Sequence, residues 1–151
     1  MERGALSGSL SVLLVLFLAQ FFIGMALNLL VTLPTNVFPA GGGSFTHAIA
    51  YALTGGNLLS ASHFLIDMVV IAVGALNLVL VLHRHVVYKV LSILSFASVI
   101  SAFVNGVRFV ASNFSINGIS YGMAGGFMAA FVLYFAMAML MYRDIATQDK
   151  P

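Results

Sequence analysis

The sequence predicts an all-α integral membrane protein: a four-helix bundle with both termini in the cytoplasm (N-in/C-in) and a short amphipathic helix in the first outer loop. Composition is the first observation behind this fold class. Of the 151 residues, 62% are hydrophobic and only 7% are charged, whereas a soluble domain is about 45–50% apolar and about 25% charged. The second observation is a set of four apolar stretches, each long enough for a helix that crosses about 30 Å of hydrocarbon. A single four-span domain over residues 1–151 contains all of them.

The four predicted spans are helices rather than strands. Only helices and closed barrels satisfy every backbone polar group in lipid, and the chain lacks the alternating apolar and polar residues of barrel strands. Short connections join the second span to the third and the third to the fourth, so we expect these neighbours to be antiparallel. The spans cover approximately residues 9–31, 60–82, 87–111 and 120–142.

The basic residues predict how the spans are oriented. Five of the six Lys and Arg residues precede the first span, lie between the second and third, or follow the fourth. The positive-inside rule assigns these positions to the cytoplasm, including a short tail over residues 143–151. The two segments expected outside, 32–59 and 112–119, contain neither Lys nor Arg. The five basic residues are Arg3, Arg84, Lys89, Arg143 and Lys150.

The first outer segment is the longer of the two and contains its own helix signals. Prolines and a run of glycines interrupt the chain after the first span, and Ser44 then has the character of an N-cap. Apolar residues follow at helical spacing until Gly55 and Gly56, which would end the helix. At about 11 residues this helix is too short to span, so we expect it on the outer membrane surface or capping the bundle. Its apolar face, which we expect to be buried against the bundle or lipid, comprises Phe45, Ala48, Ile49, Ala52 and Leu53.

Asp67 and Arg108 are the two charged residues deep inside the long apolar runs, whereas Lys89 lies at the start of the third span. An ionisable group in hydrocarbon costs several kcal/mol by most estimates, so it usually faces a partner or a watery cavity. The two residues lie at similar depth on neighbouring helices, and we expect a direct or one-water contact between them. One interpretation is a buried ion pair that fixes the register of the helices. The other is a functional pocket that opens outward.

Further polar residues fall in the same outer layer. His63 precedes Asp67 by one turn on the same helix face. Asn28 and Asn105 reach this depth from the first and third spans, and His47 lies on the polar side of the short outer helix. The candidate ligand-binding residues are therefore His63, Asp67, Arg108, Asn28, Asn105 and His47.

The ligand of such a pocket is left open among a haem, a quinone and a lipid headgroup. Haem iron takes axial histidine ligands, and cofactor sites form in the cores of helix bundles. If haem is bound, His63 or His47 would hold the iron, because His63 is the one histidine within a span and His47 is its one plausible partner.

The sequence favours binding over catalysis. It has no paired carboxylates, no metalloprotease motif, no nucleophile elbow and no phosphate-binding glycine loop, and it has no cysteine. We expect a small binding or accessory subunit of a membrane complex, for example a respiratory one, in the plasma or cytoplasmic membrane. Its partners would be the lipid bilayer and either further copies of the chain or other membrane subunits. Nucleic acid is not expected, because there is no basic run. The alternative is a small oligomeric transporter or channel, with a proton- or anion-linked path through Asp67, Arg108 and His63.

Overall fold

The protein is all-helical. The computed structural model describes residues 2–32, 34 and 36–148, and this part of the chain contains no strand. Four of its helices are long and apolar enough to cross a membrane, as the sequence predicted. In chain order the elements are α1 (Glu2–Leu30), α2 (Phe45–Ala50), the π-helical turn η1 (Tyr51–Gly55), α3 (Leu58–Leu80), α4 (Val86–Ala111) and α5 (Asn117–Gln148).

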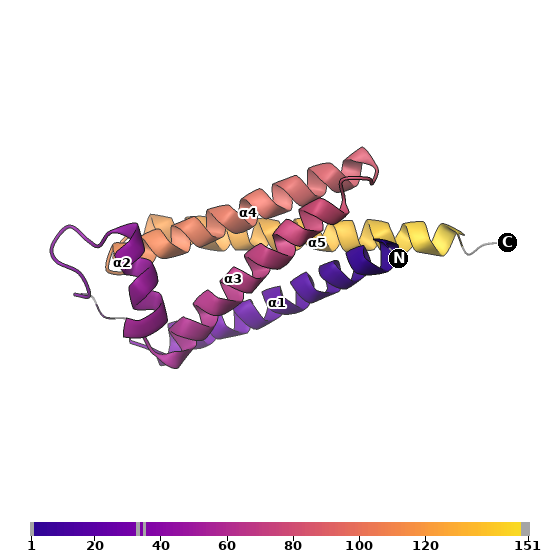
Figure 1. Ribbon diagram of the computed structural model, residues 1–151. Helices are drawn as coiled ribbons and strands as arrows, with labels where there is room; N and C mark the ends of the chain where they lie inside the picture. The colour runs from indigo at the N-terminus through magenta and orange to yellow at the C-terminus, as the bar shows by residue number, and fades with distance from the viewer. Residues whose placement is uncertain (1, 33, 35, 149–151) are drawn as a thin grey trace.

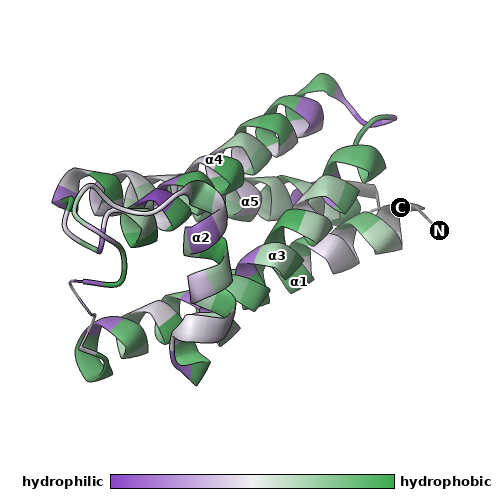
Figure 2. Cartoon of the chain, turned by 60° about the vertical axis from the view of Figure 1, so that its left-hand side comes forward, coloured by the Kyte–Doolittle hydropathy of each residue, from purple (hydrophilic) through white to green (hydrophobic). Residues whose placement is uncertain are grey.

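The four long helices form two packed pairs. Helix α1 lies against α3, and α4 lies against α5, while contacts between α3 and α4 and between α1 and α5 join the pairs into a bundle (Figure 1). Both chain ends and the 81–85 connection lie at one end of the bundle, which we call the terminal end. The short helix α2 lies at the opposite end, the α2 end, between the two pairs. Hydrophobic residues predominate along all four long helices (Figure 2), and many of the large ones are exposed on the surface of the bundle.

The half of the bundle nearest the terminal end has a continuous core. Leu6, Leu10 and Leu13 recur at helical spacing on α1 and are buried against Tyr134 and Met137 of α5. This half also contains one fully buried polar network, in which Asn77 joins two serines from different helices. Its Nδ2 donates to Ser9 Oγ at 3.1 Å, and its Oδ1 accepts from Ser92 Oγ at 2.8 Å.

At the α2 end, the chain between α1 and α3 folds over the bundle. Ser44 caps α2 as predicted, since its side chain accepts a hydrogen bond from the backbone N–H of His47. The helical segment ends at Gly55, as predicted. Ala48 and Ile49 pack into a small cluster with Phe64 of α3.

Two residues of the predicted apolar face do not pack against the bundle. Phe45 is 42% exposed and Leu53 is 40% exposed. The physical reason for Leu53 is the π-helical turn η1: its wider i→i+5 winding shifts the residues after Ala50 out of the 3.6-residue period. Whether these two side chains meet lipid, as an amphipathic surface helix requires, stays a prediction.

Hydrogen bonds to backbone groups hold the segment before α2 against the end of α4 and the turn that follows it. The Asn113 side chain accepts from the Phe38 N–H at 2.8 Å and donates to the Phe38 carbonyl at 3.2 Å. The Gly43 N–H donates to the Ala111 carbonyl at 2.8 Å. Gly42 has a φ of +91° and passes so close that a Cβ there would lie 2.6 Å from the Ala111 oxygen, so only glycine fits. We call this arrangement the loop latch.

Candidate functional site

A cavity of about 430 Å³ lies inside the bundle at the α2 end. All four long helices line it, and Ala48, Tyr51 and Ala52 of the α2–η1 segment cover it. Its deepest lining residues toward the terminal end are Gln20, Asp67 and Phe127. The Phe127 ring stands edge-on against Phe17 of the packed core, with ring centroids 5.2 Å apart, so the aromatic core closes the cavity on that side.

Most of the cavity wall is apolar and much of it is aromatic. Seven aromatic rings come from five helical elements and from the loop before α5. The polar side chains are fewer and concentrate on the side formed by α1 and α3. The aromatic residues are Phe21, Tyr51, Phe64, Phe103, Phe109, Phe114 and Phe127.

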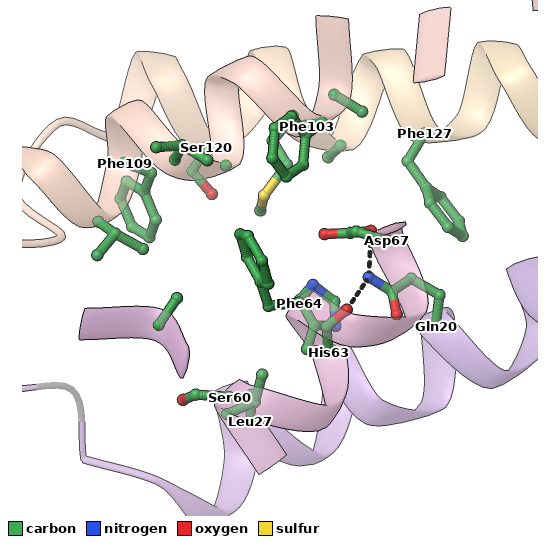
Figure 3. Close-up of a pocket in the computed structure, with 18 of the residues that line it drawn as sticks. Gln20, Leu27, Ser60, His63, Phe64, Asp67, Phe103, Phe109, Ser120 and Phe127 are labelled. Atoms are coloured by element: carbon green, nitrogen blue, oxygen red, sulfur yellow. Dashed lines mark hydrogen bonds between the residues drawn. The ribbon is translucent and has the colours of Figure 1, made fainter. Parts of the chain in front are cut away.

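The polar side of the cavity centres on the amide of Gln20. This side chain is only 4% exposed, and its Nε2 donates to Asp67 Oδ1 and to the His63 carbonyl oxygen, the latter at 3.1 Å (Figure 3). Because both neighbours are oxygen acceptors, the amide nitrogen must face them, and Oε1 points the other way. Both amide hydrogens are therefore used within the protein.

Three polar atoms of this cluster have no partner among the described residues. Gln20 Oε1 and His63 Nδ1 are buried and make no hydrogen bond. Asp67 Oδ2 also accepts no hydrogen bond from the described residues, because the Gln20 amide donates to the other carboxylate oxygen, Oδ1. Figure 3 shows this free oxygen pointing away from Gln20, toward the open side near Phe64 and Phe103. One oxygen of the Asp67 carboxylate is therefore bound by Gln20, and the other can accept a hydrogen bond from a ligand.

Helix geometry explains why these three residues meet. His63 and Asp67 are four residues apart on α3 and share a face. Gln20 lies ten residues before the end of α1 at Leu30, and Asp67 lies nine residues after the start of α3 at Leu58. At 1.5 Å per residue both are about 14–15 Å from the α2 end. Gly24 on α1 leaves room for the imidazole, since a Cβ there would lie 3.3 Å from His63 Cε1.

The structure brings together three of the six predicted site residues. Asn28, His63 and Asp67 line the cavity. Arg108, Asn105 and His47 do not line it: Arg108 and His47 are exposed, and Asn105 is half-buried.

The prediction of a direct contact between Asp67 and Arg108 was wrong, and contact through one water stays a prediction. Within the described side chains, the one ion pair closer than 4.0 Å joins Arg143 to Asp144, and the oxygen of Asp67 is held by Gln20 instead. The reason is the rotation of α4. Its buried face carries Ser92, Ser95, Val99 and Val107, and Arg108 projects about 100° away from Val107.

Asn105 needs no partner in the cavity because its own helix satisfies it. Its Nδ2 donates to the Ser101 carbonyl one turn earlier, at 2.9 Å, and its side chain packs where Gly122 of α5 leaves space. The polar stripe of α4 that includes Asn105 and Arg108 is thus turned toward α5 and the outside rather than toward α3.

Gln20 is the site residue that sequence reasoning missed. It lies within the first predicted span, at 9–31, but is not among the six candidate residues. Counting residues back from the end of that helix, rather than forward from the start of the apolar stretch, places it at the depth of Asp67.

The structure does not bring the two candidate haem ligands into one cavity, because His47 lies outside it. Among the described residues no three His, Cys, Asp or Glu side chains cluster as a metal site would require. Two methionines, Met25 and Met123, do share the cavity with His63. No protein-family model, curated protein or solved structure matches the chain.

Proposed function

We propose that this protein is a multi-pass membrane protein that binds a small, largely apolar molecule in its cavity and acts as a binding or accessory subunit of a membrane complex. The observation that carries the proposal is the cavity itself. A volume of about 430 Å³ lies within the range of about 300–1,000 Å³ that small-molecule sites occupy. Apolar walls with a few convergent polar groups are also typical of such sites.

The polar cluster supports binding over a purely structural role. A network that only fixes helix packing would leave no buried donor or acceptor unpaired, because each unpaired group costs about 1–3 kcal/mol. The Asn77 network at the terminal end meets that standard. The Gln20–Asp67–His63 cluster does not. Its unpaired atoms border the cavity, unlike the Tyr134 hydroxyl, which is also unpaired but lies in the packed core.

Ligand-induced stabilisation tests the proposal. The purified protein in detergent would be heated with a panel of small amphiphiles, among them a short-chain quinone, a haem and a lysolipid. A ligand that occupies the cavity at 100 times its Kd stabilises the fold by about 2.7 kcal/mol.

A matched pair of variants on α4 gives the control. Ala102 lines the cavity, so Ala102→Phe fills it and should abolish the shift. Ala97 is exposed on the same helix, so Ala97→Phe should leave the shift intact. If no compound stabilises the wild type, or if both variants respond equally, the cavity is not a ligand site.

We further propose that the protein lies in the plasma or cytoplasmic membrane and that both of its termini face the cytoplasm. The distribution of basic residues supports this orientation. The chain has no native cysteine, so single cysteines can be introduced without background. Cysteines at 41–43 should react with an impermeant reagent added to intact cells, and cysteines at 84–86 should not. The reverse pattern would overturn the orientation.

The exposed surface of the long helices supports partners within the membrane. Side chains such as Val15, Phe22 and Val132 are more than half exposed, which fits contact with lipid, with further copies or with other membrane subunits. Native mass spectrometry from mild detergent distinguishes these cases, because only bound subunits survive as defined masses.

Transport is a second proposal. It is favoured by the free carboxylate oxygen of Asp67 inside the cavity, since intramembrane carboxylates and histidines commonly carry protons. An anion path through Arg108 has no such support, because that side chain lies outside the cavity. Proton flux into liposomes that contain the protein, compared with liposomes that contain Asp67→Asn, tests this version.

A further inference from the structure

The cavity is electrostatically one-sided. Asp67 is the only carboxylate among the described residues that line it, and none of them is Lys or Arg. The one basic residue within the same region of the spans, Arg108, is exposed and outside the cavity. Among the described residues the carboxylate therefore has no cationic partner within 4.0 Å, and its hydrogen bond comes from the amide of Gln20.

The polar atoms left over at this site are mainly acceptors. Both hydrogens of the Gln20 amide are used on Asp67 and on the His63 carbonyl. What remains on these two side chains is Gln20 Oε1 and Asp67 Oδ2, and neither can donate when Asp67 is ionised. Of the two, Gln20 Oε1 is buried, whereas Asp67 Oδ2 points to the open side of the cavity (Figure 3). A ligand with only acceptors, such as a quinone ring, is a poor match for this oxygen.

Aromatic rings around the free oxygen suit a positive charge. Figure 3 shows Phe64 and Phe103 on the side to which this oxygen points and Phe127 on the far side of Asp67, and the rings of Phe64 and Phe103 have centroids 5.7 Å apart. The face of an aromatic ring attracts cations, and aromatic cages are the usual recognition sites for quaternary ammonium groups. The rest of the wall is apolar and would hold a hydrocarbon body.

We propose that the ligand of this cavity is an organic cation, an ammonium or similar onium group attached to an apolar body. The charged group lies against Asp67 Oδ2, and the body lies among the aromatic side chains of α3, α4 and α5. This inference rests on the proposed function, since it names the chemical class of the molecule that the cavity binds. The same onium chemistry occurs in free amines and in choline lipid headgroups, and the test separates these two sources.

The test compares two probes of the same shape. Benzyltrimethylammonium carries a fixed positive charge, and neopentylbenzene is its neutral analogue, with carbon in place of nitrogen. Their affinities are measured by calorimetry on the full-length protein in one detergent. Each affinity is taken as a ratio between wild type and variant, so that partition into micelles cancels.

Asp67→Asn should lower the affinity for the cation about tenfold or more relative to the wild type. The affinity for neopentylbenzene should stay unchanged in this variant, because asparagine keeps an oxygen for Gln20. Asp144→Asn makes the same chemical change at the terminal end, outside the cavity, and should alter neither affinity. Phe103→Leu keeps an apolar wall without the aromatic face and should lower the cation affinity several-fold, which provides a second variant if Asp67→Asn does not fold.

The outcomes separate the two claims. If Asp67→Asn changes the affinities for the cation and for neopentylbenzene by the same factor, the ligand class is wrong and the cavity remains a binding site. Binding of neither probe overturns both the proposed function and this inference. Competition by lysophosphatidylcholine that depends on Asp67 would identify the bilayer as the source of the onium group, and competition by free amines alone would identify a soluble or membrane-partitioned amine.

Discussion

The two halves of the bundle use similar residues for different purposes. At the terminal end, Asn77 is fully buried and both ends of its amide are paired. At the α2 end, Gln20 and His63 are also enclosed, but each keeps an unpaired atom, and Asp67 keeps a free oxygen beside a cavity. The comparison teaches that a polar residue in a membrane bundle is not in itself a functional signal. What distinguishes the two cases is whether the surrounding side chains close around it.

The sharpest test of this difference uses two leucines on α1. Leu13 is fully buried at the terminal end, whereas Leu27 lines the cavity. Leu13→Ala should lower the free energy of unfolding by about 2–5 kcal/mol, because it opens a void in a packed core. Leu27→Ala enlarges an existing space and should cost about 1 kcal/mol or less. Unfolding in mixed micelles with increasing SDS measures both, and equal losses would show that the two halves are packed alike.

Two glycines test how readily each half of the bundle accommodates an added methyl group. A Cβ on Gly74 would lie 3.0 Å from both the Phe96 ring and the Tyr134 hydroxyl, whereas one on Gly24 would meet His63 at 3.3 Å beside the cavity. Gly74→Ala should therefore cost about 1–3 kcal/mol through overpacking. Gly24→Ala should cost about 0.5 kcal/mol or less, since the imidazole can move toward open space.

In both variants alanine also has a higher helix propensity than glycine, which raises the stability and opposes the cost of overpacking. Gly125→Ala measures this helix propensity alone. No atom lies within 4 Å of a Cβ at that position. Thermal unfolding of the three variants in one detergent provides the comparison. A Gly24 variant that is less stable than the Gly74 variant would mean that the α2 end is the more rigid half.

A smaller effect is expected from the polar residues. Asn77→Ala leaves Ser92 without its partner on α3 and should cost about 1–2 kcal/mol. Asn105→Ala removes a hydrogen bond within α4 only and should cost about 0.5 kcal/mol or less. Both values come from the same SDS titration. A larger loss for Asn105 would indicate that the polar stripe of α4 contributes to helix association after all.

The smallest effect on global stability concerns the loop latch. Asn113→Ala removes both hydrogen bonds to Phe38, so amide exchange of Phe38 and Gly43 should accelerate about tenfold. The unfolding free energy of the bundle should change by about 0.5 kcal/mol or less, because the latch lies outside the core. Asn36→Ala, at an exposed position nearby, is the control, and hydrogen-exchange mass spectrometry is the measurement. Exchange that accelerates along the long helices as well would show that the latch stabilises the bundle itself.

Local chemistry made much of the fold predictable. The lengths of the apolar stretches alone located the four long helices. A stretch of this length must form a helix in lipid, because a helix satisfies its own backbone hydrogen bonds there. The N-cap at Ser44 and the stop at Gly55 follow from side-chain and backbone preferences that act within a few residues. The ends of α1 and α5 were less predictable, since both helices continue past the apolar stretch, to Glu2 and to Gln148.

The candidate site was only half predictable. His63 and Asp67 share a face of one helix, so their proximity follows from helix geometry. The partner of Asp67 did not follow, because Gln20 and Arg108 were both possible by depth. Ser98 and Asn105 of α4 bond to carbonyl groups one turn earlier on their own helix, although Ser92 bonds across to Asn77 of α3. A polar stripe that is satisfied in this way gives no information about which face points inward.

The sequence by itself determined that this protein has four membrane-length helices and placed a carboxylate and an imidazole one turn apart within one of them. Only the tertiary structure decided that Gln20 rather than Arg108 meets Asp67, and that a cavity lies beside them. The physical reason is that a helix in lipid is apolar on every side, so hydropathy fixes its length and depth but not its rotation. The rotation of each helix is set by packing, through close approaches such as that of Gly126 to the α4 backbone, and these depend on two helices at once.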